Sequence, residues 1–139
     1  MPHVALLCEY PTLNGGERSL LSTLPGLVPQ GFHFTAIAPA EGPLADALTA
    51  QGVKVVPFVM TDAAAQRLAQ DTLRAALSEY LRRLKPDLVH ANSLAMGRLV
   101  GPVAAELGLP SVAHLRDGGN GLLEPLPPPT HHATGHDRQ

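Results

Sequence analysis

The feature of this sequence that most limits its fold is a regular alternation of short apolar runs with longer segments of helical period. Five apolar runs are predicted strands, at residues 3–8, 32–38, 53–59, 88–91 and 111–115. The segments between them carry leucines at helical spacing, at residues 17–27, 44–50, 62–84 and 95–107. Such alternation is typical of a parallel sheet whose strands are joined by crossover helices.

Right-handed crossovers turn this element order into an α/β, Rossmann-like, doubly wound parallel sheet of about five strands. We expect one domain over residues 1–117, with strand order 3-2-1-4-5. Asp71 is the expected N-cap of the best-defined part of the third helix. Residues 118–139 hold a GGNG run, three consecutive prolines and three of the seven histidines. This composition predicts a disordered Gly/Pro/His-rich tail, either natural or the product of a truncated or frame-shifted reading frame.

The overall charge and the cysteine content exclude several classes of protein. A net charge of -2 with a pI near 6.4 argues against nucleic acid as a partner, since such proteins usually present a basic face. One cysteine cannot form an internal disulfide, which fits a reducing compartment. No apolar run approaches the roughly 20 residues of a membrane helix. We expect a cytoplasmic protein, either free or peripheral at the inner membrane face.

The predicted topology brings three polar segments together at one edge of the sheet. In open α/β sheets, ligands bind beyond the carboxyl ends of the strands where the strand order reverses, here between the first and fourth strands. Residues 9–17, residues 91–94 and the pair Arg116 and Asp117 all follow strands that end there. Their convergence is the main physical argument for a binding site.

The first of these segments ends in Asn14, Gly15 and Gly16 at the start of a helix. Glycines let a ligand approach the backbone closely, and the free N–H groups of a helix's first turn can face an anion or a sugar hydroxyl. Alternatively, the glycines are turn residues and Asn14 is a helix cap. The G-x-x-x-x-G-K-[ST] and G-x-G-x-x-G patterns are absent from the sequence, which disfavours ATP hydrolysis and NAD chemistry.

The second segment holds Asn92 and Ser93, just past the fourth strand. Their side chains can donate to and accept from hydroxyl groups, or they can cap the following helix. His90, inside the apolar strand, is expected to be a core histidine with a hydrogen-bond partner.

The third segment places His114 and Arg116 on the same face of the fifth strand. An imidazole there can act as acid, base or hydrogen-bond donor, and a guanidinium can grip phosphate or carboxylate. The alternative for Arg116 is an ion pair with Asp117 or Glu9. Histidines 131, 132 and 136 lie in the tail, so we expect no metal site, only adventitious binding.

Three landmarks occur together in this sequence. They are N-G-G-E-R-S-L-L at 14–21, K-P-D-L-V-H-A-N at 85–92 and G-L-P-S-V-A-H-L-R-D at 108–117. In this order and spacing they resemble the N-terminal domain of family 4 glycosyltransferases, the large GT-B group of retaining enzymes. The resemblance covers residues 3 to 117.

The resemblance implies transfer of a sugar from a nucleotide sugar, often a UDP- or GDP-sugar, to a sugar, lipid-linked or other acceptor. It implies that this domain mainly receives the acceptor, that Gly15 and Gly16 lie near the donor phosphates, and that His114 lies near the transferred sugar as the candidate catalytic residue. No metal or other cofactor is implied; the nucleotide sugar is a co-substrate.

The donor domain of that family, with its paired glutamates, has no counterpart in these 139 residues. We therefore expect an acceptor-binding domain that is inactive by itself and is completed by a separate donor domain. The alternative is a non-catalytic Rossmann-like module that binds a glycan or a protein.

Overall fold

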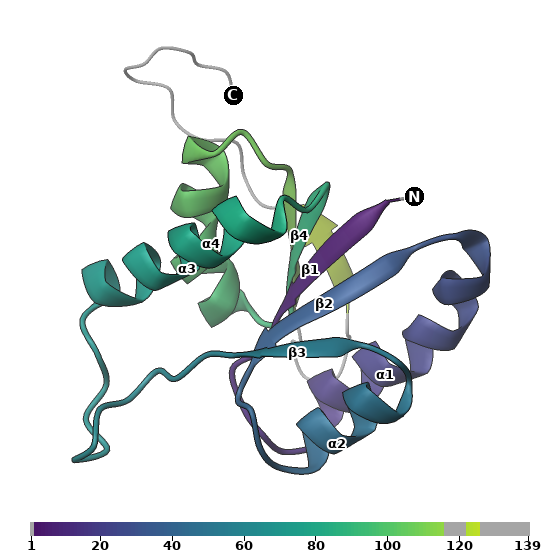
Figure 1. Cartoon of the computed structure of the whole chain (residues 1–139), viewed down its shortest axis with the longest axis horizontal. Helices are drawn as coiled ribbons and strands as arrows, with labels where there is room; N and C mark the ends of the chain where they lie inside the picture. The colour runs from purple at the N-terminus through teal and green to yellow at the C-terminus, as the bar shows by residue number, and fades with distance from the viewer. Residues whose placement is uncertain (1, 116–121, 126–139) are drawn as a thin grey trace.

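The computed structural model, which describes residues 2–115 and 122–125, is a three-layer α/β domain (Figure 1). Its elements in chain order are β1 (His3–Leu7), α1 (Gly15–Leu27), the 3-10 helix η1 (Val28–Gln30), β2 (His33–Ala38), α2 (Pro43–Ala50), β3 (Lys54–Pro57), α3 (Gln70–Leu84), β4 (Leu88–Ala91), α4 (Leu94–Glu106), β5 (Ser111–Leu115) and β6 (Leu122–Pro125). The predicted strands and helices are all present, most within one or two residues of the expected ends.

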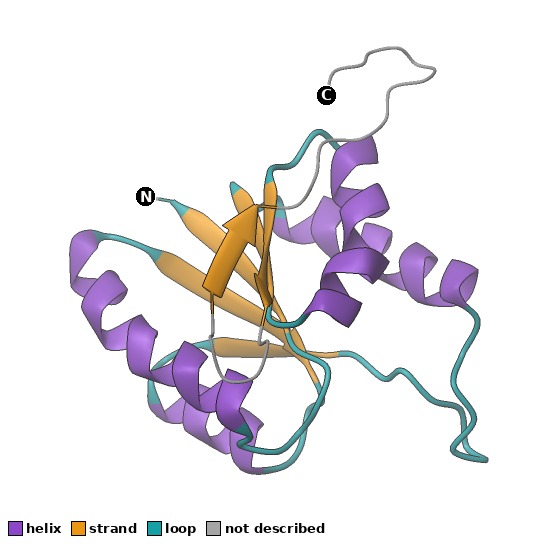
Figure 2. Ribbon diagram, turned by 180° about the vertical axis from the view of Figure 1, so that it is seen from behind, coloured by secondary structure: helices purple, strands orange, loops and turns teal. Residues whose placement is uncertain are grey.

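The six strands form one sheet in the order β3-β2-β1-β4-β5-β6. Strands β1 to β5 are parallel, so the predicted order 3-2-1-4-5 is confirmed, and β6 runs antiparallel to β5. Helices α1 and α2 cover one face of the sheet, and α3 and α4 cover the other (Figures 1 and 2). The order reverses between β1 and β4, where the chain leaves one face for the other.

Strand β1 is buried on both faces, which explains its unbroken apolar sequence. Ala5 and Leu7 belong to the core beneath α3 and α4. Val4, Leu6 and the following Cys8 belong to the core beneath α1 and α2. Because side chains alternate between the two faces of a strand, β1 contributes residues to both cores.

Two details differ from the sequence expectations. Helix α3 begins at Gln70 with Ala69 as its N-cap, so Asp71 lies inside the first turn, where its charge still suits the helix dipole. Strand β6 lies within the segment expected to be a disordered tail, and the rest of that tail is outside the described residues. Pairing with β6 satisfies backbone hydrogen-bonding groups along the outer edge of β5. The sequence did not predict this strand, because four residues are too few to show an apolar period.

The loop after β1 is held against the start of α2 through Gly42. The Leu44 N–H donates to the Pro11 carbonyl oxygen at 2.9 Å. Gly42 has a φ of 123°, and a Cβ added there would lie 2.9 Å from both Pro11 Cβ and Pro11 O. Only glycine therefore allows the loop that leads to α1 to pack this closely.

Replacing Gly42 with alanine is expected to lower the free energy of unfolding by about 1–3 kcal/mol, because the new Cβ meets Pro11 in a disfavoured backbone conformation. Gly26→Ala is the matched control, since Gly26 lies inside α1 and an added Cβ meets nothing within 4 Å. That control is expected to be neutral or stabilising by about 0.5–1 kcal/mol. Urea unfolding of both variants measures the difference, and equal stabilities would contradict the packing argument.

Candidate functional site

The carboxyl ends of β1 and β4 lie side by side, as the topology predicts. Leu7 pairs with Ala91 in the parallel register. The next residue, Asn92, donates its N–H to the Leu7 carbonyl at 2.9 Å. Cys8 and Asn92 are therefore the first residues beyond the paired ends, at the edge of the sheet where the strand order reverses.

Helix α1 is the element that follows β1. Asn14 is the N-cap; its N–H donates to Glu17 Oε1 at 3.0 Å, and its carbonyl accepts the first helical hydrogen bond, from Arg18 N–H, at 2.9 Å. Gly15 and Gly16 are the first two helical residues, and neither has a positive φ. The backbone conformation does not demand glycine there.

The buried Glu17 carboxylate, which caps the first turn of α1, acts electrostatically on Cys8 at the end of β1. Burial, followed by the negative charge of Glu17, raises the pKa of the Cys8 thiol to about 12. The thiol is therefore protonated at neutral pH and is a poor nucleophile. Cys8 is a packing residue of this edge.

Three polar side chains gather at the ends of β4 and β5: Asn92 and His114 are buried, and His90 is half-buried. His90 pairs in register with Val112, so His114, two residues further along, faces the same side of the sheet. The two imidazole rings meet edge to face, with centroids 6.5 Å apart. Nε2 of both rings and both side-chain polar atoms of Asn92 are buried without a hydrogen-bond partner.

His90 differs from the expected core histidine, because its Nε2 has no partner. Burial, together with the nearby charge of His114, lowers the pKa of His90 below the ordinary 6.5. The Asn92 side-chain amide lies near enough to His90 to oppose this lowering of the pKa. Neither its Oδ1 nor its Nδ2 atom makes a well-formed hydrogen bond. The His90 ring is therefore neutral at physiological pH.

We expect the fold to lose stability as the pH falls from about 8 to about 5. Burial lowers the pKa of His3 as well as that of His90 below 6.5 in the folded state. The unfolded chain then binds more protons than the folded chain below that pH, so the free energy of unfolding decreases toward acid. Urea midpoints across the range measure this, and His90→Gln is expected to flatten the dependence. A midpoint that rises toward acid would contradict the assignment.

The remaining residues considered in the sequence analysis differ in where they lie and in what they contact. Ser93 is the N-cap of α4, and its Oγ accepts the Met96 N–H at 3.1 Å. Glu9 pairs with Arg67 at 3.4 Å. Arg116, and histidines 131, 132 and 136, lie outside the described residues. Within residues 2–115 and 122–125, no group of three or more His, Cys, Asp or Glu side chains is placed to hold a metal ion.

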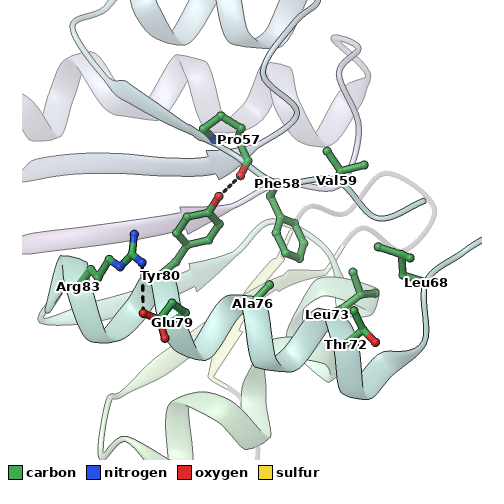
Figure 3. Close-up of a pocket in the computed structure, with 10 residues that line it drawn as sticks. All are labelled: Pro57, Phe58, Val59, Leu68, Thr72, Leu73, Ala76, Glu79, Tyr80 and Arg83. Atoms are coloured by element: carbon green, nitrogen blue, oxygen red, sulfur yellow. Dashed lines mark hydrogen bonds and ion pairs between the residues drawn. The ribbon is translucent and has the colours of Figure 1, made fainter. Parts of the chain in front are cut away.

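A hollow of about 480 Å³ lies elsewhere, between α3 and the end of β3 (Figure 3). Its ten lining residues are Pro57, Phe58, Val59, Leu68, Thr72, Leu73, Ala76, Glu79, Tyr80 and Arg83. The Tyr80 hydroxyl donates to the Pro57 carbonyl at 2.5 Å and closes one end. Strand β3 is two strands away from β1, so this hollow is separate from the edge where β1 and β4 end. No motif in the sequence indicated it.

No helix in the described part of the chain is long and apolar enough to cross a membrane.

Comparisons with solved structures show the fold in larger proteins. MurG of Acinetobacter baumannii matches with a TM-score of 0.66 and 19% identity, over 84% of this chain and 35% of that one. HepE of Anabaena, solved with UDP and glucose, matches with a TM-score of 0.63 and 19% identity, over 82% of this chain and 30% of that one. A glycosyltransferase of Rickettsia africae matches with a TM-score of 0.61 and 16% identity, over 81% and 29%.

This chain therefore spans about a third of the length of these structures. A search of curated proteins found no match. The family model of the glycosyl transferase 4-like domain matches residues 14–136, which is most of the sequence. The resemblance noted in the sequence is thus confirmed by the fold and by the family model. The chain belongs to the glycosyl transferase 4-like domain family.

Proposed function

We propose that this chain is the acceptor-side domain of a glycosyltransferase that moves a sugar from a nucleotide sugar to a hydroxyl-bearing acceptor. The observation that carries the proposal is the set of buried, unpartnered polar atoms on Asn92 and His114 at the carboxyl edge of the sheet. A buried polar group without a partner costs about 1–3 kcal/mol. Hydroxyl groups of a sugar or a sugar acceptor supply the missing partners.

The start of α1 fits the donor diphosphate. The N–H groups of the first helical turn, at Gly15 and Gly16, carry the positive end of the helix dipole. Glu17 is the one acidic residue of that turn, and its carboxylate is buried and bonded to the Asn14 N–H. In this proposal, the glycine N–H groups of the turn bind the diphosphate.

Each remaining candidate residue has a role in this proposal. His114 donates or accepts a proton at the reacting hydroxyl, and Asn92 orients the sugar or the acceptor. Ser93 accepts a hydrogen bond as the cap of α4, but its own hydroxyl proton remains available to donate. Arg116, two residues beyond His114 in sequence, neutralises phosphate charge.

We further propose that the chain does not transfer sugar by itself. Glycosyl transfer requires a donor held in line with the acceptor in a site that excludes water. The chain matches about a third of each solved relative, which supports a division in which another domain holds the nucleotide sugar. A sugar or a lipid-linked acceptor is the expected partner on this side.

The test compares the chain alone with the chain joined to the donor domain of a family 4 enzyme. Both are incubated with labelled UDP- and GDP-sugars and a panel of sugar and lipid-linked acceptors. We expect product only from the joined form. Turnover by the chain alone would overturn the proposed inactivity. Saturable glycan binding without turnover in either form would favour a non-catalytic binding module.

A further inference from the structure

Two of the helices that the structure describes contain a proline beyond their first turn. Pro25 lies in α1, and Pro102 lies in α4. A helical N–H group normally donates to the carbonyl four residues earlier. Proline has no N–H, and its ring pushes that carbonyl aside. The Leu21 carbonyl in α1 and the Arg98 carbonyl in α4 therefore lack the donor that the helix would otherwise supply.

Each of these two carbonyls accepts a hydrogen bond from the helix that shares its face of the sheet (Figure 1). In α4, the Arg98 carbonyl accepts from Nη2 of Arg74 in α3 at 2.9 Å, and Nε of Arg74 donates to the Leu99 carbonyl at 2.9 Å. In α1, the Leu21 carbonyl accepts from Nε2 of Gln51, the C-terminal cap of α2, at 3.3 Å. A side chain thus supplies the donor that each proline removes.

The other side-chain hydrogen bonds to helix carbonyls show that this placement is selective. Within residues 2–115 and 122–125, three such bonds join one helix or its cap to another helix, and two of the three end on a carbonyl that a proline has freed. Elsewhere the bonds stay local: Thr23 donates to the Ser19 carbonyl, and Gln30 donates to the Gly26 carbonyl. The contacts between helices therefore lie where the backbone needs a donor.

We propose that Arg74 and Gln51 act as braces: each replaces the backbone hydrogen bond that a proline removes, and so fastens α3 to α4 and α2 to α1. Each pair of helices is thereby held in one relative arrangement by a contact specific to that pair. A guanidinium suits the site on α4, because its forked donors reach two successive carbonyls at once. The proposal does not depend on the proposed function.

A double-mutant cycle in the full chain tests the brace at Arg74. Arg74→Met keeps an unbranched apolar stem and a similar helix propensity but removes the donors. We expect it to raise the equilibrium constant for unfolding about tenfold, the effect of a lost hydrogen bond from a charged group. Pro102→Ala gives the Arg98 carbonyl a backbone donor again. In that background, Arg74→Met is expected to raise the constant only about threefold, because the two changes share one acceptor.

Gln51→Met and Pro25→Ala form the same cycle on the other face of the sheet. The expected effect of Gln51→Met alone is about threefold, since its hydrogen bond is longer and exposed. Arg82→Met and Gln30→Met are the matched controls, because the hydrogen bonds of both side chains stay local. Each control is expected to change the constant about twofold or less, with or without the proline substitution. Urea unfolding followed by circular dichroism measures every variant.

The comparison between backgrounds decides the outcome. An Arg74→Met effect that is equal with and without Pro102→Ala would overturn the brace on α4, and the corresponding result for Gln51→Met would overturn the brace on α1. If Arg74→Met does not fold, Arg74→Lys takes its place in the cycle, since an ammonium lacks the fork that reaches both carbonyls. Equal effects of Arg74→Lys in the two backgrounds would overturn the proposal in the same way.

Discussion

Replacing His114 with alanine is expected to lower the kcat of the completed enzyme by a factor of about 10² to 10⁴, the usual contribution of a general acid or base. His114 is buried at the end of β5, and its Nε2 has no partner within the fold, so it is available to a bound hydroxyl. The measurement is sugar transfer by the chain joined to a donor domain. The loss is expected in kcat more than in KM, because proton transfer matters in the transition state.

His33→Ala is the matched control, since His33 is exposed at the opposite end of the sheet and is expected to leave kcat unchanged. His114→Gln keeps a hydrogen-bonding side chain of similar length. It provides a second test of His114 if the His114→Ala variant does not fold. Urea unfolding of each variant separates lost activity from lost structure. A folded His114→Ala enzyme with near-normal kcat would show that this residue takes no part in the reaction.

Replacing Leu99 with alanine is expected to lower the free energy of unfolding by about 2–5 kcal/mol. Leu99 is fully buried in α4, within the core that α3 and α4 form against the sheet. The loss combines the transfer of the deleted groups to water with the cavity left behind. It is a large share of the roughly 5–15 kcal/mol that stabilises an ordinary domain.

Leu94→Ala is the matched control for this change, because Leu94 begins the same helix and is 42% exposed. Its effect is expected to stay within about 0.5 kcal/mol, as for most surface substitutions. Urea unfolding followed by circular dichroism measures both variants. Similar losses at the two positions would mean that α4 does not pack as the structure shows.

The architecture could be predicted because its signals are repeated many times along the chain. Each strand is a short apolar run, each helix carries leucines at period 3.6, and crossovers between parallel strands are right-handed. These local rules led to the strand order on either side of β1 and to the edge where β1 and β4 end. They were less reliable at the helix ends, as Asp71 shows, because a cap depends on the backbone of one or two residues.

The sequence predicted which residues lie at this edge of the sheet, but not which of them find hydrogen-bond partners within the fold. Asn92 and Ser93 are adjacent and chemically alike, yet Ser93 caps α4 while Asn92 has no partner for its side chain. The sequence predicted that His90 is a core residue, because it lies inside an apolar strand. Whether the His90 Nε2 atom finds a hydrogen-bond partner depends on its neighbours in the fold, which include His114 of β5. That strand begins more than twenty residues further along the chain.

Sequence alone therefore determined the fold class, the strand order and the edge at which β1 and β4 end, since these follow from periodicity and from the handedness of crossovers. Tertiary structure decided which polar groups find partners, where β6 pairs and where the hollow beside α3 forms. The physical reason is that hydrogen-bond satisfaction and cavity shape are properties of residues distant in sequence that meet only after packing.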